Sequence, residues 1–224
     1  MANFNLNDGV VDRATILKKK VSNKIIKYQK AYGAQLFDKN LNFIYKNLDR
    51  GITLVEYFSN NTKLILNKKI LHVAPEENLK KFFFLNINRY KIKCYHINDF
   101  SNEANFAFNI ENILLKKNTY DLIICHRVLE HVHNDLGAIK SMLKILKPNG
   151  ILNVSFPENP MQKTVNWYIP DKSHNEHVRH YGNDFSKMLK KNNINLTLDK
   201  FFLKGNILRS KKIFPMRIYN ISKS

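Results

Sequence analysis

Residues 120–157 read YDLIICHRVLEHVHNDLGAIKSMLKILKPNGILNVSFP, and this stretch decides the fold. Two runs in it, at 120–126 and 151–156, are apolar on both faces, as central strands covered by helices are. Between the two runs, apolar residues recur every three or four positions and predict a helix with one buried stripe. They are Leu136, Ile139, Met142, Leu143 and Leu146. A strand, a helix and a strand in this order form a unit of a parallel sheet.

Further short runs rich in β-forming residues continue the pattern on either side. They predict strands at 69–74, 92–97, 106–108, 196–203 and 215–221. The last two are consecutive and close, so we expect them to pair antiparallel at an edge. Asn134 or Asp135 can cap the helix between the central strands, and Pro148 with Gly150 stops it. A shorter amphipathic helix begins at Asn183 or Asp184.

The length and composition fit one globular domain. A chain of 224 residues with 44% hydrophobic residues can bury a sizeable core, and no linker or repeat divides it. We therefore expect a single domain over 1–224. Its regions are a helical cap at 1–60, with helices at 11–30 and 41–58, a ligand-binding core at 69–156, a lid segment at 157–182, and a helix with a strand pair at 183–224.

The net charge of +19 does not by itself indicate a nucleic-acid partner. The lysines are scattered in twos and threes over the whole chain, which favours a solvated surface over a specific nucleic-acid footprint. Cys94 and Cys125 each lie in an apolar or β-branched run, so a disulfide framework is not expected. The chain has neither a membrane-spanning apolar run nor a secretory signal, and we expect a cytoplasmic protein.

The loops that follow the predicted strands carry the chemistry, because an open α/β sheet binds its ligand beyond the carboxyl ends of its strands. The first of these loops, from His72 to Glu76, contains no glycine. A dinucleotide site needs a glycine-rich loop there, so the sequence argues against NAD or FAD. Asp99 follows the second strand, where it either accepts both hydroxyls of a ribose or caps a turn. Asn109 and Ile110 follow the third and can face a purine.

The motifs in these loops resemble those of class I S-adenosylmethionine-dependent methyltransferases. In that family the fourth strand reads D-L-I-x-x-x-x-V-L-E-H and the fifth follows L-K-P-G-G; here Asn149 replaces the first glycine. The segments at 71–76 and 176–185 resemble the L-H-x-A-P-E and H-V-R-x-Y-G-x-D-F motifs of one subset. The resemblance implies a Rossmann-like fold whose seven-stranded, mostly parallel sheet has one antiparallel edge strand and helices on both faces.

The resemblance also implies roles for single residues. His72, Ala74, Pro75 and Glu76 line the methionine part of the cofactor S-adenosyl-L-methionine. Asp99 binds its ribose, Asn109 and Ile110 flank its adenine, and His126 lies beside the transferable methyl group. Asn109 stands where the family often has Asp, which alters the adenine contact.

Glu130 and His131 lie below the acceptor pocket in this family, and nearby residues hold a metal ion in some quinone-modifying members. We favour a structural role, with capping and hydrogen bonds inside the loop, over metal ligation, and expect no metal site.

The segment 157–182 leaves the fifth strand where acceptors bind, and it supplies the candidate acceptor residues. His177, His180 and His126 are candidates for a general base, because an imidazole titrates near neutral pH. Arg179 and Tyr181 are candidate substrate contacts, and Arg179 can hold an anionic acceptor. The alternative is a lid whose aromatic and charged residues serve stability.

Together these features predict transfer of a methyl group to oxygen or nitrogen of a small polar acceptor, such as a sugar or a surface-glycan precursor. An RNA methyltransferase and a cofactor-binding homologue without catalysis remain the alternatives. No specific nucleic-acid partner is expected, and the oligomeric state is left open.

Overall fold

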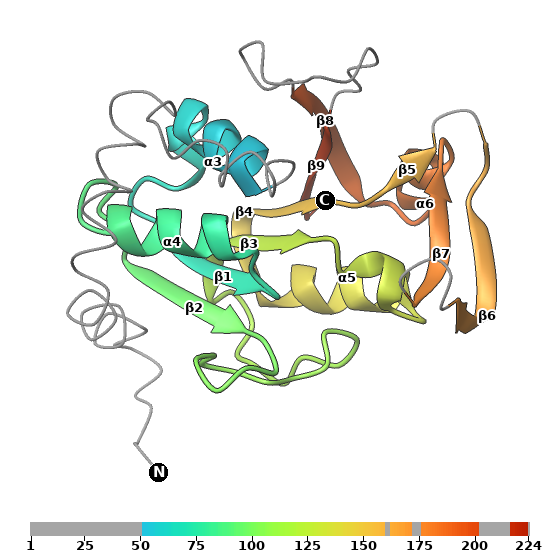
Figure 1. The fold of residues 1–224 in the computed structure, drawn as a ribbon, viewed down its shortest axis with the longest axis horizontal. Helices are drawn as coiled ribbons and strands as arrows, with labels where there is room; N and C mark the ends of the chain where they lie inside the picture. The colour runs from blue at the N-terminus through green and yellow to red at the C-terminus, as the bar shows by residue number, and fades with distance from the viewer. Residues whose placement is uncertain (1–50, 160–161, 172–175, 202–215, 224) are drawn as a thin grey trace, which may run out of the picture. The chain divides into compact units, whose positions relative to one another are not determined.

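The computed structural model describes residues 51–159, 162–171, 176–201 and 216–223 (Figure 1). The described residues divide into two compact units, of which one comprises 51–68 with 76–96, and the other comprises 69–75 with the described residues from 97 onward. The helix predicted at 11–30 lies outside the described residues, and so does most of the helix predicted at 41–58.

The first unit is held together by aromatic side chains. Helices α3 (Gly51–Asn60) and α4 (Glu77–Asn86) belong to it, together with the short helix η1 (Thr62–Leu64). The rings of Phe58 and Phe83 lie 5.5 Å apart edge to face, and Phe83 stacks on Tyr95 at 5.0 Å. Such ring pairs add about 0.5–1.5 kcal/mol each to the stability that burial alone provides.

The main sheet has six strands in the order β2-β1-β3-β4-β9-β8. Their bounds are β1 (Lys69–Val73), β2 (Cys94–Asn98), β3 (Tyr120–His126), β4 (Leu146–Ser155), β8 (Asn195–Phe201) and β9 (Met216–Ser222). Strand β3 runs parallel to β1 and to β4, with Leu122 opposite Ile70 on one side and Ile151 on the other. The predicted parallel α/β sheet is confirmed (Figure 1).

Helix α5 (Asp135–Ile145) connects β3 to β4, and the predicted stripe lies against the core. Ile139 and Met142 are fully buried. The side chain of Asn134 accepts a hydrogen bond from the Gly137 amide at 2.9 Å, so the predicted cap is confirmed. Asn149 has a φ of 62°, which explains why this residue stands in place of a glycine.

Two details of the predicted sheet are corrected. The segment at 106–108 forms only an isolated bridge from Phe106 to Asn98. The Asn98 side chain binds the backbone N–H and C=O of Phe108 at 2.9 and 3.1 Å, so it replaces the ladder of a further strand. The described sheet therefore has six strands rather than seven. The antiparallel strand β9 lies between β4 and β8, whereas β8, with its exposed polar residues, forms the edge.

The segment predicted as a lid contains a second, smaller sheet in the order β5-β7-β6. Its strands are β5 (Glu158–Asn159), β6 (Val165–Asp171) and β7 (His177–Gly182), and α6 (Phe185–Lys191) follows. A Cβ atom at Gly182 would lie 2.3 Å from the backbone oxygen of Gln162, so only glycine fits where β7 ends. No helix among the described residues is long and apolar enough to span a membrane.

Candidate functional site

The carboxyl ends of the parallel strands bring the predicted residue Ala74 and the further residue Arg127 to one edge of the sheet. Ala74 follows β1, and its amide donates a hydrogen bond to the Asn98 carbonyl at 2.8 Å. Arg127 follows β3, and its amide donates to the Ser155 carbonyl of β4 at 2.8 Å. An open sheet of this kind binds ligands beyond such strand ends.

Two of these residues have a strained backbone. Ala74 has a φ of 43° and Arg127 a φ of 59°, although neither is a glycine. The left-handed region costs such residues about 1–3 kcal/mol each, and it is enriched at functional sites. The strain falls on the first residue after β1 and on the first after β3, at the edge of the sheet where an open α/β sheet binds its ligand.

The first loop turns sharply from a buried strand to an exposed position. His72 is almost fully buried within β1, whereas Ala74 is exposed and Pro75 partly so. Glu76 belongs to the other compact unit, where it stands at the N-cap of α4. Within the second unit, Ala74 and Pro75 are therefore the residues of the first loop with exposed surface.

The side chains of Asp99 and Asn109 each accept a hydrogen bond from a nearby backbone amide, but they differ in how much accepting capacity remains. Asp99 is partly exposed, and one carboxylate oxygen accepts a hydrogen bond from the Phe100 amide at 2.9 Å. A carboxylate offers about four acceptor positions, so two hydroxyl groups can still bind. The Asn109 side chain accepts from the Glu111 amide at 2.9 Å, and Ile110 is buried in the core cluster. The side-chain oxygen of Asn109 is therefore already engaged in a hydrogen bond within its own turn.

His126 is a buried and weakly basic ring. It is 3% exposed, and its Nδ1 lies 2.7 Å from the Ser155 hydroxyl. Burial lowers the pKa of His126 from an ordinary value of 6.5 to about 3. A base of this strength accepts a proton poorly near neutral pH, so His126 is the least suited of the three candidate bases.

This pKa makes the stability of the protein sensitive to acid. At pH 5 the unfolded His126 binds a proton and the folded one does not, so stability falls as the pH falls from about 6.5 towards 3. When the pH falls from 7 to 5, we expect the protonation of His126 in the unfolded state to lower the free energy of unfolding by about 2 kcal/mol. Urea unfolding at both pH values should show that this loss is much smaller in His126→Gln. The exposed His133→Gln variant serves as the control and should keep the wild-type dependence; equal pH dependence in all three proteins would contradict the assignment.

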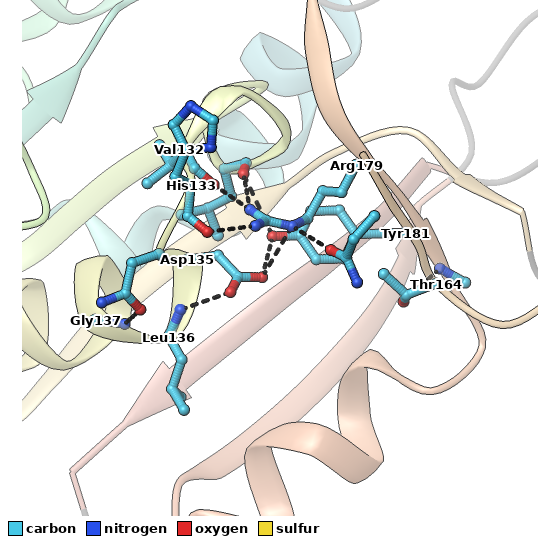
Figure 2. A network of polar contacts seen from close by, with 12 residues as sticks. Val132, His133, Asp135, Leu136, Gly137, Thr164, Arg179 and Tyr181 are labelled. Carbon is cyan, nitrogen blue, oxygen red and sulfur yellow. Dashed lines mark hydrogen bonds and ion pairs between the residues drawn. The ribbon is translucent and has the colours of Figure 1, made fainter. Parts of the chain in front are cut away.

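Arg179 ties the loop after β3 to strand β7 (Figure 2). The side chain is 6% exposed, and its NH1 and NH2 groups donate to the carbonyls of Leu129, at 2.9 Å, and His133, at 2.7 Å. NH1 also donates to the Val132 carbonyl, and Nε donates to the Asn166 side chain at 3.1 Å. The guanidinium therefore fixes the residues around the short helix η2 (Leu129–His131).

Asp135 completes this network, as Figure 2 shows. It lies 3.6 Å from the Arg179 Nε and accepts a hydrogen bond from the Tyr181 hydroxyl at 2.7 Å. The predicted substrate contacts Arg179 and Tyr181 thus use their polar groups inside the chain. The structure favours the alternative of a stabilising role for both, because a guanidinium with this many internal partners is poorly placed to hold an acceptor.

Three predicted residues from two segments that are far apart in the sequence come together instead. The His131 and His177 rings lie 4.8 Å apart edge to face, and ligand atoms of Glu130, His131 and His177 all lie within 4.8 Å of one another. Glu130 and His177 are buried and His131 is exposed. The Arg127 Nε lies 3.3 Å from a Glu130 oxygen. His180, the third candidate base, has its ring 6.2 Å from that of His177.

Comparison with known proteins identifies the family. Residues 36–198 match the methyltransferase domain family, which is well over half of the chain. The chain therefore belongs to this family. The predictions of a methyltransferase and of S-adenosyl-L-methionine as its cofactor are confirmed at the level of the family.

Solved structures show the same fold at low sequence identity. A methyltransferase of the DUF858 family from Leishmania major, described as dependent on S-adenosylmethionine, is 14% identical, with a TM-score of 0.55 over 89% of this chain and 82% of its own. An S-adenosylmethionine-dependent methyltransferase from Archaeoglobus fulgidus is 10% identical, with a TM-score of 0.53 over 84% and 100%. The YcgJ protein of Bacillus subtilis is 13% identical, with a TM-score of 0.51 over 76% and 98%. No curated protein sequence matches the chain.

Proposed function

We propose that the protein transfers a methyl group from S-adenosyl-L-methionine to oxygen or nitrogen of a small polar acceptor, such as a sugar or a surface-glycan precursor. The observation that carries the proposal is the strained, glycine-free turn at Ala74, which lies at the same sheet edge as Arg127 and the end of β4. A cofactor without a pyrophosphate needs no glycine-rich cradle there.

On the cofactor side, we propose for each residue the role that the motifs imply. Ala74 and Pro75, with His72 and Glu76 beside them in sequence, serve the methionine part. Asp99 serves the ribose through its remaining acceptor positions. Ile110 supplies an apolar contact for adenine, and the backbone of Asn109 serves it better than its engaged side chain.

On the acceptor side, the protein mainly positions the acceptor, since the sulfonium cofactor itself supplies the leaving group. An acceptor hydroxyl must also lose its proton. His177 and His180 are the proposed residues for this step, because burial lowers the pKa of His126 to about 3 and its ring therefore accepts a proton poorly. Glu130 and His131 lie beside His177 and contribute to the same side of the site.

The acceptor class is tested with a cofactor that carries a labelled methyl group. Purified protein is incubated with the labelled cofactor and either a pool of nucleotide sugars and glycan precursors or total RNA. We expect label in the low-molecular-weight sugar fraction. Label in RNA would support the alternative of an RNA methyltransferase, and cofactor binding without transfer to either pool would favour a homologue without catalysis.

Asp99→Ala is expected to weaken cofactor binding by about 1.5–3 kcal/mol, the typical value of hydrogen bonds to a charged group. Calorimetry with S-adenosyl-L-methionine in the presence of a chelator measures this difference. Glu103→Ala removes the same charge from the same loop and should bind the cofactor like the wild type. Equal affinity of the Asp99→Ala variant and the wild type would show that the ribose lies elsewhere.

A further inference from the structure

We propose that Glu130, His131 and His177 form a binding site for a divalent transition-metal ion such as Zn²⁺. Each of the three residues offers one ligand atom, and these atoms all lie within 4.8 Å of one another. They come from η2 and from β7, which follows η2 in the chain by more than forty residues. The tertiary fold thus brings His177 to the neighbouring residues Glu130 and His131.

The donor set selects the class of ion. Two imidazoles and one carboxylate suit Zn²⁺ and similar first-row ions, whereas Mg²⁺ and Ca²⁺ prefer oxygen donors. Ligand atoms at about 2.1 Å from one ion stand about 3–3.5 Å from each other, so the widest separation in the cluster, up to 4.8 Å, must shrink by up to about 1.3–1.8 Å. His131 can supply this movement, because its side chain is exposed while Glu130 and His177 are packed. Three protein ligands leave a coordination position open to water or to an oxygen of a bound molecule.

The surroundings hold two of the ligands in place. Arg179 hydrogen-bonds to the carbonyls of Leu129 and His133, on either side of Glu130 and His131, and so fixes the backbone that carries them. Hydrogen bonds that orient the residues behind a metal ligand raise affinity in this way.

The charges around the cluster also bear on the site. Glu130 is fully buried, and its carboxylate faces the Arg127 guanidinium at 3.3 Å. A buried carboxylate gains from a further cation, so the metal either joins this ion pair or replaces Arg127 in it. Asp135 lies 3.6 Å from the Arg179 Nε and offsets the second guanidinium nearby.

The site gives His177 a role different from that of a general base. A ring nitrogen that binds a cation has no lone pair left for a proton, so His177 is a ligand while the ion is bound. The inference does not depend on methyl transfer, because metal binding is measured without cofactor or acceptor. Its failure would leave the proposed function standing, with His177 available as a base.

The test is a Zn²⁺ titration of the full-length protein after treatment with a chelator, in competition with a chromophoric chelator. We expect one equivalent of Zn²⁺ per chain and a rise in melting temperature on binding. His131→Ala and His177→Ala should each lower the affinity by at least about 10–100-fold, as loss of even an outer contact does. His131 is exposed, so its variant should fold even if the His177 variant does not.

His133→Ala is the matched control. It removes an exposed histidine two residues from His131 and keeps the carbonyl that Arg179 binds. It should bind Zn²⁺ like the wild type. Absence of stoichiometric Zn²⁺ binding by the wild type overturns the inference, and so does equal affinity of the wild type and the His131→Ala variant. An equal loss in His131→Ala and His133→Ala would also overturn it, since that result reports a general effect on the loop.

Discussion

Replacing Arg179 by methionine is expected to lower the free energy of unfolding by about 3–5 kcal/mol, the usual loss when one partner of a buried ion pair is removed. The side chain is 6% exposed and binds three backbone carbonyls and Asn166. Methionine fills much of the volume but donates no hydrogen bond, so these acceptors lose the guanidinium donor and the Asp135 carboxylate loses its ion-pair partner. Urea unfolding at neutral pH measures the difference.

Arg89→Met is the control for this experiment. Arg89 is exposed and lies over the Tyr90 ring at 5.5 Å, so its loss should change the free energy of unfolding by no more than about 0.5 kcal/mol. Equal stability of the two variants would mean that the contacts of Arg179 contribute nothing in solution. In that case the guanidinium would again be available for an anionic acceptor.

His177→Ala is expected to lower turnover by about a hundredfold or more while leaving cofactor affinity intact, the usual contribution of a positioned base. A metal ligand at this position predicts a loss in the same direction, so a second measurement is needed. A base alone makes wild-type turnover indifferent to a chelator, whereas a required metal makes the chelator inhibit. Turnover is measured with the acceptor found by methyl labelling, and cofactor affinity by calorimetry.

The alternative for His177 is a purely structural role on β7. It predicts a lower melting temperature with turnover nearly unchanged at a temperature where the variant is folded. His133→Ala is again the control, because it removes an exposed histidine from the loop that follows η2. It should match the wild type in melting temperature and in turnover. Full activity in a destabilised His177→Ala protein would remove His177 from the mechanism.

The parts of the fold that rest on local pattern were predictable from the sequence. Strand β3 has the predicted bounds of 120–126, and its run of apolar residues is buried as expected of a central strand. The Asn134 cap and the positive φ of Asn149 follow from the chemistry of single residues. The strand predicted at 106–108 does not form, because the Asn98 side chain takes the place of a partner strand. The amino-acid composition of the segment does not reveal such a hydrogen bond.

For the proposed acceptor side, the sequence predicts a set of residues but not their geometry. The motif at 176–182 marked His177, Arg179 and Tyr181 as important, yet it did not separate the ligand-like residue from the structural ones. Arg179 binds backbone carbonyls. Every residue has such a carbonyl, so the sequence does not show which of them Arg179 will bind. The approach of His177 to Glu130 and His131 likewise depends on how β7 docks, which is a property of the tertiary fold.

The bonds of Arg179 also bear on the order in which the molecule can be assembled. Their carbonyl partners lie 46 to 50 residues earlier in the chain. Contacts of such long range close a large loop and form late in folding. On the ribosome, β1, β3 and α5 emerge before Arg179 does, so the residues around η2 acquire their final geometry only after β7 has been synthesised. A nascent chain halted before residue 176 would therefore contain the strand ends of the cofactor side without a fixed loop beside them.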